Sequence, residues 1–318
     1  MIRRSSLLRA AVGAAISVVA IWLVLRSVDV GRTADTLRSA DLGWIGLAAG
    51  FLVIDLVVRA VRWQRLVAPI AHIRFIAMLE YLLIGYVANN VLPARLGELV
   101  RSHYLGDREG LSRTTTLGTV VVERVVDFIV VVAIAAAAIL VLSVRGVVAS
   151  AVLIGLALAG LAVVAITVGI AAHRLPGADR LGGLVARWPG IGELARKLRG
   201  GLAVAGRPRT LVEALGLSII AWGATVLAFA AAGQSVGVEL TIGQASLLAS
   251  GVALATAIPA GPANLGTFEL AAVEIGKAVG IAAAPAFAIA LLVHAVILVV
   301  TSLGGGISLA RLGWRRAS

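Results

Sequence analysis

Arginine and carboxylate side chains stand within otherwise apolar sequence, and the first group of them suits the binding of an anion. Arg95, Glu98 and Arg101 follow one another at intervals of three residues, after an apolar run that starts at Phe75. A guanidinium group matches phosphate or carboxylate oxygens with two parallel hydrogen bonds. We therefore expect Arg95 and Arg101 to hold an anionic group, and Glu98 to orient one of them or to carry a proton. Asn90, just upstream, either joins this site or satisfies freed backbone groups.

Glu123, Arg124 and Asp127 form a second charged group inside a long apolar stretch. Residues three or four apart share one face of a helix, so these side chains lie near one another. A charge buried at the centre of a bilayer costs about 2.5–3.5 kcal/mol, so the charges must pair or face a polar cavity. Two interpretations stay open: a structural bridge from Arg124 to either carboxylate, or a cavity wall that binds an anionic group.

A third polar group lies among prolines and glycines at residues 259–269, where Asn264 and Glu269 are the candidate binding residues. The string Pro-Ala-x-Leu-Gly occurs both here and at residues 93–97. Proline removes a backbone donor and glycine permits backbone angles closed to other residues, so both strings predict breaks in helices. Broken helices at matching places in two halves are typical of transporter binding sites. The residues expected to build the turns are Pro93, Gly97, Pro259, Pro262 and Gly266.

Three further polar features are better explained as structural contacts. Asp55 and Arg59 are four residues apart, which predicts an ion pair on one helix face. Glu274 and Lys277 are three apart, which predicts a pair near a surface. His294 stands alone in an apolar run, and this position favours a hydrogen bond between helices.

The remaining residue types argue against catalysis and against a metal or cofactor. The chain has no cysteine, and its four histidines show neither a His-x-x-x-His nor a His-Glu-x-x-His spacing. No serine nucleophile motif and no glycine-rich phosphate loop is present in the sequence. We therefore expect a protein that is not an enzyme and binds no metal and no cofactor, although a membrane-embedded transferase would need none of these motifs.

Membrane helices must position these groups. The chain has 318 residues, of which 60% are hydrophobic and only 14% are charged, whereas a soluble domain is nearer a quarter charged. Several apolar runs reach the roughly 20 residues that span a bilayer core. The net charge of +12 comes from arginines in the short loops between these runs, the pattern that marks cytoplasmic loops. This pattern accounts for the charge, so we expect no nucleic-acid binding.

Six apolar runs predict full crossings, and two interrupted runs predict re-entrant hairpins. Residues 26–41 balance three arginines against three aspartates and are expected to be an outer loop. Residues 173–210 carry eight lysines or arginines and two acidic residues, which predicts a basic cytoplasmic loop, with residues 191–202 as a candidate amphipathic helix on anionic lipid. The predicted crossings are residues 10–25, 42–58, 114–142, 147–172, 211–232 and 285–310, and the predicted hairpins are residues 75–105 and 245–281.

Loop charge decides how the halves of the chain relate. Arginines after the first interrupted run stay on the cytoplasmic side only if that run turns back, which gives each half three crossings and one hairpin. An odd number of crossings inverts the second half relative to the first. The sequence therefore predicts an all-α polytopic integral membrane protein with two inverted repeats, each with three transmembrane helices and one re-entrant broken helical hairpin. A single transmembrane domain covers residues 1–318, with repeat one at about residues 7–142, repeat two at about residues 147–310, and both termini cytoplasmic.

Three motifs run through the polar groups: Asn90-x-x-Pro93-x-Arg95-x-Gly97-Glu98-x-x-Arg101, Glu123-Arg124-x-x-Asp127 and Pro259-x-x-Pro262-x-x-x-Gly266-x-x-Glu269. Together they resemble the lysylphosphatidylglycerol synthase transmembrane-region family, also called flippase-like domain proteins. The resemblance covers nearly the whole chain. In the third motif the family usually has glycines where this chain has Ala263 and Asn264, and Asn tolerates left-handed backbone angles.

The resemblance implies a lipid translocator. In larger members of the family this domain moves an aminoacylated phosphatidylglycerol between leaflets after a soluble carboxy-terminal domain attaches the amino acid. Some relatives are linked to polyprenyl-phosphate sugar carriers. This chain ends at Ser318, so we expect a stand-alone member without the synthase domain.

We expect a multi-pass, flippase-like transporter in the cell (inner or plasma) membrane that moves a lipid with an anionic head group, either a phospholipid or a polyprenyl-phosphate-linked lipid. Two alternatives fit the same architecture: a secondary transporter of a small solute, and a non-transporting scaffold for envelope-lipid synthesis. The expected partners besides lipid are a second copy of the chain or an envelope-synthesis enzyme docked on the basic loop. The expected binding residues are Asn90, Arg95, Glu98, Arg101, Glu123, Arg124, Asp127, Asn264 and Glu269.

Overall fold

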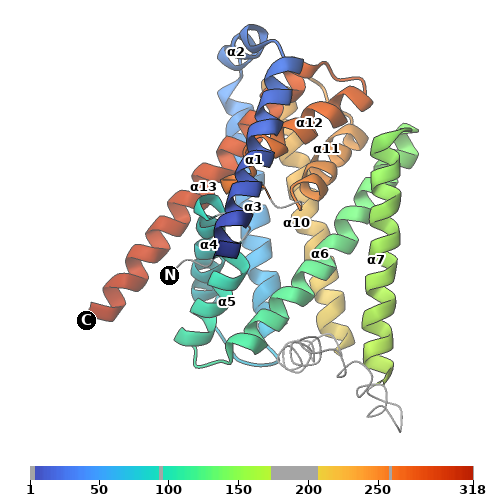
Figure 1. Ribbon diagram of the computed structural model, residues 1–318. Helices are drawn as coiled ribbons and strands as arrows, with labels where there is room; N and C mark the ends of the chain where they lie inside the picture. The colour runs from blue at the N-terminus through green and yellow to red at the C-terminus, as the bar shows by residue number, and fades with distance from the viewer. Residues whose placement is uncertain (1–3, 93–95, 173–206, 258–259, 318) are drawn as a thin grey trace.

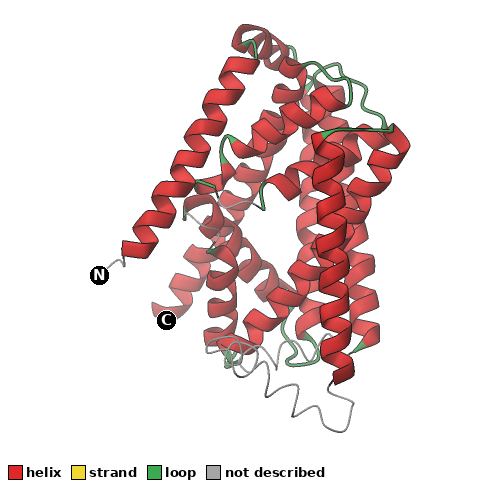
Figure 2. Ribbon diagram, turned by 45° about the vertical axis from the view of Figure 1, so that its right-hand side comes forward, coloured by secondary structure: helices red, strands yellow, loops and turns green. Residues whose placement is uncertain are grey.

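The computed structural model describes the backbone of residues 4–92, 96–172, 207–257 and 260–317, and side chains over most of these ranges. Helices make up all the regular structure of the described chain, and short loops and turns link them wherever the linking residues are described (Figure 2). The helices are α1 (Arg4–Ser27), α2 (Val30–Arg38), α3 (Leu42–Val67), α4 (Phe75–Val91), α5 (Gly97–Arg108), α6 (Arg113–Leu142), α7 (Val147–Ala172), α10 (Pro208–Ser235), α11 (Ile242–Ala255), the short 3-10 helix η3 (Pro262–Asn264), α12 (Thr267–Ala278) and α13 (Ala283–Ala317).

Several of these helices are long and apolar enough to cross a membrane. Among the described residues, four helices meet this condition alone: α3, α6, α10 and α13. The described part of α1 meets it together with α2, to which it is bent by 85°. Residues 147–161 of α7 form a shorter apolar helix. The protein is thus an all-helical, multi-pass membrane protein, while the inverted relation of its halves stays a prediction.

Both interrupted runs are pairs of short helices. Helices α4 and α5 pack against each other, and so do α11 and α12. In Figure 1 the first pair lies in the lower half of the molecule, toward the carboxyl terminus, and the second pair lies in the upper half. The long helix α13 contacts α4 and also α12, so it connects the two regions. The predicted basic loop, residues 173–210, falls almost entirely outside the described residues.

One expected loop contains a helix, and one expected boundary was wrong. Residues 26–41 hold the helix α2 in place of the expected loop, because Asp29 caps it by accepting a hydrogen bond from the Arg32 backbone N–H at 3.0 Å. The second predicted crossing ends at residue 58, but α3 continues to Val67. Arg59 and Arg62 therefore lie inside a helix and are buried, because partners on other helices compensate their charge.

Glycine brings the helices of the first hairpin into close contact. A Cβ added at Gly97 would lie 2.0 Å from the Gly85 carbonyl oxygen, so the backbones of α4 and α5 meet there. Gly97 does not adopt a positive φ, in contrast to the backbone freedom expected from the sequence. Gly266 in the second hairpin does, with φ of 85°. Gly97 is required for proximity, whereas Gly266 is required for its backbone angle and also for proximity, because a Cβ there would lie 2.7 Å from the Ser17 carbonyl oxygen on α1.

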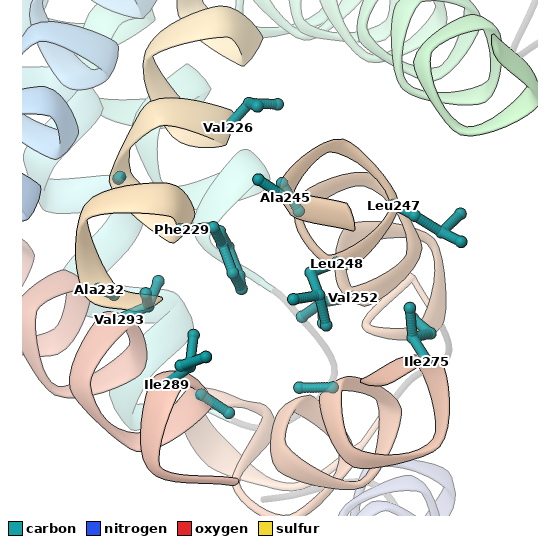
Figure 3. Packing of buried hydrophobic residues seen from close by; sticks show 14 of the residues in the cluster. Val226, Phe229, Ala232, Ala245, Leu247, Leu248, Val252, Ile275, Ile289 and Val293 are labelled. Carbon is teal, nitrogen blue, oxygen red and sulfur yellow. The ribbon is translucent and has the colours of Figure 1, made fainter. Parts of the chain in front are cut away.

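Apolar side chains from α10, α11, α12 and α13 form one large buried cluster (Figure 3). Phe229 on α10, Leu248 on α11 and Ile289 on α13 are each at most 2% exposed. In a bilayer such packing contributes through van der Waals contact, because lipid tails are as apolar as leucine. The cluster fixes the second hairpin against two long helices.

Candidate functional site

Arg62 on α3 lies at the centre of a buried network of charges. Its side chain is 0% exposed. Its guanidinium group lies 2.8 Å from Glu123 and also contacts Asp127, and both carboxylates belong to α6. Ser218 on α10 accepts a further hydrogen bond from Arg62 Nη1 at 2.6 Å. One polar cluster therefore joins α3, α6 and α10.

Asp127 accepts hydrogen bonds from α3 and from α10. Arg59 Nη1 lies 3.0 Å from Asp127, and Arg59 Nε lies 2.8 Å from Asp55, which is the ion pair predicted from the spacing. Trp222 Nε1 donates to Asp127 at 3.1 Å. The Arg59 guanidinium also lies 4.8 Å from the centre of the Trp222 ring, where a cation is attracted to the π face. These donors supply the compensation that a buried carboxylate requires.

Arg124 is the accessible member of the network. Its Nη2 lies 2.8 Å from Glu123 and 3.2 Å from Asp127, so the three residues grouped by spacing do meet. Its side chain is 41% exposed, whereas the other arginines of the described network expose at most 9%. Its Nε is buried and lacks a hydrogen-bond partner among the described residues. Arg124 is thus held by two carboxylates yet retains unsatisfied donor capacity.

The first hairpin contributes Arg101 to this network. Arg101 Nη1 lies 3.0 Å from Glu123, and the guanidinium packs 4.6 Å from the centre of the Trp63 ring. Glu98 is half-buried and is 3.5 Å from Asn89 Nδ2. Among the described residues no ion pair joins Glu98 to Arg101, so the carboxylate that orients Arg101 is Glu123. Pro93 and Arg95 from the same motif, and Pro259 from the third motif, lie outside the described residues.

The two asparagines before the first break have different roles. Asn89 Oδ1 accepts a hydrogen bond from the Gly97 N–H at 2.7 Å and so satisfies the start of α5. Asn90 Nδ2 donates to Thr301 at 2.9 Å and to Ser302 at 3.0 Å, both on α13. Asn90 therefore connects the first hairpin to α13, in addition to lining the cavity described next.

A cavity of about 530 Å³ opens beside the charge network. One part of its wall is polar and comes from α3, α4, α6, α10 and α13, and the other part is aromatic and aliphatic. Binding sites for small molecules commonly combine an apolar wall with a few polar groups in this way. The polar wall includes Asp55, Arg59, Asn90, Arg124, Asp127 and Thr301, and the apolar wall includes Leu52, Phe128, Val131, Phe229, Phe268 and Ile297.

A second, more apolar groove of about 310 Å³ runs along α6. Leu117, Val121 and Val125 line it, and Glu98 lies at its border. Arg124 and Phe128 line both the cavity and the groove. The accessible guanidinium therefore stands between a polar chamber and an apolar surface.

The second hairpin holds its candidate residues apart from the charge network. Glu269 accepts a hydrogen bond from the Gly266 N–H at 2.7 Å and lies 2.6 Å from His294 Nδ1. His294 Nε2 lies 2.9 Å from the Ala263 carbonyl oxygen, which is the helix-contact role expected of it. Asn264 adopts a left-handed φ of 55°, and its carbonyl accepts from Thr267 at 2.9 Å. Neither Asn264 nor Glu269 lines the cavity.

Sequence reasoning missed Arg62 and treated Asp55 and Arg59 as structural. The available signal was the spacing of Arg59 and Arg62, three residues apart and directly after an apolar run. Spacing predicts only the pair of Asp55 and Arg59, because the partners of Arg62 stand more than 60 residues away. Helical periodicity gives no signal for a contact between residues so far apart in the sequence.

Comparison with known proteins gives a family and one distant relative. No solved structure matches the chain. A glycosyltransferase from Haloferax volcanii, AglD, is 25% identical over 135 residues, which covers 42% of this chain and 22% of that protein. This chain therefore matches about a fifth of the length of that relative. The family model described as the lysylphosphatidylglycerol synthase TM region matches residues 10–305, and the chain belongs to this family.

Proposed function

We propose that the protein is a flippase-like transporter that moves a lipid with an anionic head group between leaflets. The head group would be a phospholipid phosphate or a polyprenyl-linked phosphate. The observation that carries the proposal is the position of Arg124, whose partly exposed guanidinium lines both a polar cavity and an apolar groove. We also propose that the protein lies in the cell membrane with both termini in the cytoplasm, from the charge of its loops.

The charge network supports an anionic head group. Four guanidinium groups and three carboxylates meet among the described residues around the cavity: Arg59, Arg62, Arg101, Arg124, Asp55, Glu123 and Asp127. Guanidinium groups held in place by carboxylates bind phosphate oxygens with little further loss of side-chain freedom. Glu123 and Asp127 then act as positioning residues, and Arg124 contacts the phosphate.

The groove favours a lipid over a small soluble solute. A solute needs only a chamber, whereas a lipid must keep its chains against apolar surface while its head group moves. The groove along α6 offers such a surface next to Arg124, with Leu117, Val121 and Val125 on its wall. A cavity of about 530 Å³ is suited to a head group.

The relative from Haloferax volcanii gives a second candidate. It is named a glycosyltransferase, so a membrane enzyme acting in a lipid- or glycan-related process is the competing proposal. We propose no chemical step for this chain. Incubation of the reconstituted protein with candidate lipids, followed by lipid mass spectrometry, distinguishes the two, because an enzyme leaves a chemically altered lipid and a transporter does not.

The transport proposal is tested by leaflet exchange in proteoliposomes. Labelled lipids in the inner leaflet become accessible to an added quencher when they cross. We expect Arg124→Ala to slow this exchange by about tenfold or more, the loss for one charge-assisted phosphate contact. Arg38→Ala is the matched control, because Arg38 is 81% exposed and lies on α2. Exchange at the wild-type rate in the Arg124 variant would show that this guanidinium does not hold the head group.

A further inference from the structure

His294 joins α13 to the turn of the second hairpin through both of its ring nitrogens. Nδ1 lies 2.6 Å from Glu269 Oε1, and Nε2 lies 2.9 Å from the Ala263 carbonyl oxygen. The second oxygen of Glu269 accepts from the Gly266 N–H at 2.7 Å. Both side chains are buried, with exposed fractions of 6% and 7%. The contacts therefore tie two points of the turn, Ala263 and Gly266, to α13, while the Gly261 N–H donates to Ser17 Oγ on α1 at 3.0 Å.

The two contacts of His294 require two protons on the pair of His294 and Glu269. A neutral imidazole and a carboxylate together carry only one. A carbonyl oxygen only accepts, so Nε2 must carry a proton to contact Ala263. Nδ1 and Glu269 Oε1 then need a second proton between them, placed on either atom. With the other tautomer, the Nε2 lone pair would face the lone pairs of Ala263. Both contacts coexist only when the pair of His294 and Glu269 holds two protons.

Loss of one proton must therefore break one of the two contacts. At 2.6 Å and 2.9 Å, two facing lone pairs repel and no hydrogen bond forms. The backbone that would be released is already constrained, because Ala263 and Asn264 adopt φ of 56° and 55°. This left-handed region is unfavourable for alanine, so the strain lies at Ala263, whereas asparagine tolerates it. Strained backbone persists only where surrounding contacts hold it, so the loss of one such contact favours opening of the turn.

Other charged groups on the surrounding elements are engaged elsewhere. Among the described residues, Glu269 and His294 have no further ion pair, and Phe268 stacks on the His294 ring with centroids 4.3 Å apart. Helix α11 carries no charged residue, and Tyr86 on α4 lines the cavity. Among the charged side chains that the structure describes on α1, α4, α10, α12 and α13, the pairs are Arg26 with the Trp22 ring, Glu80 with Arg311, Arg209 with Glu213, and Glu274 with Lys277.

We propose that Glu269 and His294 form a binding site for one proton, and that this proton holds the turn of the second hairpin against α13. Release of the proton opens the turn, and rebinding closes it. Coupling of this proton to lipid movement rests on the proposed transport function. The proton site itself does not, because it is defined by the contacts of His294 alone.

The absence of cysteine from the chain allows a direct test. Ala260 is 3% exposed at the start of the turn, and Leu265, within it, is 46% exposed. Single variants Ala260→Cys and Leu265→Cys are treated with a small thiol reagent across a pH series. The labelling rate of Ala260→Cys is divided by that of Leu265→Cys, because this ratio removes most of the pH dependence of the thiol itself. We expect this ratio to rise by about tenfold or more between acidic and alkaline pH, which corresponds to loss of one charge-assisted contact.

Variants of the pair decide the interpretation. In Glu269→Gln, the amide oxygen accepts from Gly266 and the amide nitrogen donates to Nδ1, so neutral His294 satisfies every contact. This variant should keep a low ratio at alkaline pH, where the wild-type ratio is high, and His294→Ala should give a high, pH-independent ratio. His103→Gln is the control and should titrate as wild type, because His103 is half-exposed on α5.

A wild-type ratio that does not change with pH, or a Glu269→Gln ratio that titrates as wild type, overturns the proton site. If either cysteine variant fails to fold, hydrogen exchange at the Gly266 amide, which donates to Glu269, gives the same comparison. None of these measurements depends on lipid exchange. Failure of the Arg124→Ala test therefore leaves the proton site standing, and the reverse also holds.

Discussion

The two interrupted segments of this protein stabilise buried polar groups in different ways. Around the first hairpin, Glu123 and Asp127 each contact three guanidinium groups from α3, α5 or α6. In the second hairpin, Glu269 has one titratable partner among the described residues, His294. Guanidinium groups remain charged at every pH that a protein meets, whereas an imidazole and a carboxylate exchange a proton. The first region therefore carries fixed charge suited to an anion, and the second carries a charge that changes.

This difference predicts how each region responds when one partner is removed. A fixed network leaves uncompensated charge behind, and a proton-sharing pair adjusts by changing its protonation. Substitutions that neutralise or remove a side chain can therefore be ordered by expected cost. Unfolding of the purified protein in mixed micelles provides a common scale for them.

The largest effect is expected for Arg62→Ala. The side chain is 0% exposed and contacts both carboxylates of α6, so its loss leaves Glu123 and Asp127 short of a buried counter-charge. The free energy of unfolding should fall by about 3–5 kcal/mol. Arg32→Ala, at an 83% exposed position, should change it by less than about 0.5 kcal/mol. Equal effects at the two positions would mean that the network is not compensated as the contacts indicate.

The same isosteric change at Glu123 and at Glu269 compares the two regions directly. Glu123→Gln removes a negative charge that three arginines share and should lower the free energy of unfolding by about 1.5–3 kcal/mol. Glu269→Gln keeps every contact of the turn and should cost less than about 0.5 kcal/mol. Unfolding curves of both variants, measured at one pH, supply the comparison. If Glu269→Gln instead lowers the free energy of unfolding as much as Glu123→Gln, the second hairpin contains a permanent ion pair.

The limits of the sequence follow from the same comparison. Spacing within one helix identified Glu123, Arg124 and Asp127 as neighbours, and the structure brings them together. Spacing also paired Asp55 with Arg59. Contacts between helices have no such signature, so Arg62 escaped notice although it touches two of those residues. Helical periodicity predicts which residues share one face of a helix, whereas contacts between helices depend on how the helices pack.

Helix limits were predicted well where a break has a local cause. Both hairpins divide where proline and glycine occur, since those residues alter the backbone directly. Helix α3 continues past the predicted end because Arg59 and Arg62 find partners on α6, which hydropathy of a single segment does not register. The predicted crossing therefore stopped at residue 58, where the charged residues begin, although the helix continues. Helix α2 was missed because its cap is a single aspartate in a polar stretch.

A smaller loss than that for Arg62→Ala is expected when the close contact of the first hairpin is disturbed. Gly97→Ala places a Cβ 2.0 Å from the Gly85 carbonyl oxygen, so α5 must shift away from α4. Overpacking of this kind costs about 1–3 kcal/mol. Gly50→Ala on α3 is the matched control, since its added Cβ meets nothing within 4 Å and alanine favours the helix. The shift also moves Arg101, because the Gly85 position borders its side chain. Lipid exchange should therefore slow in Gly97→Ala and remain at the wild-type rate in Gly50→Ala. An unchanged rate in both variants would show that the packing of the hairpin does not control the placement of Arg101.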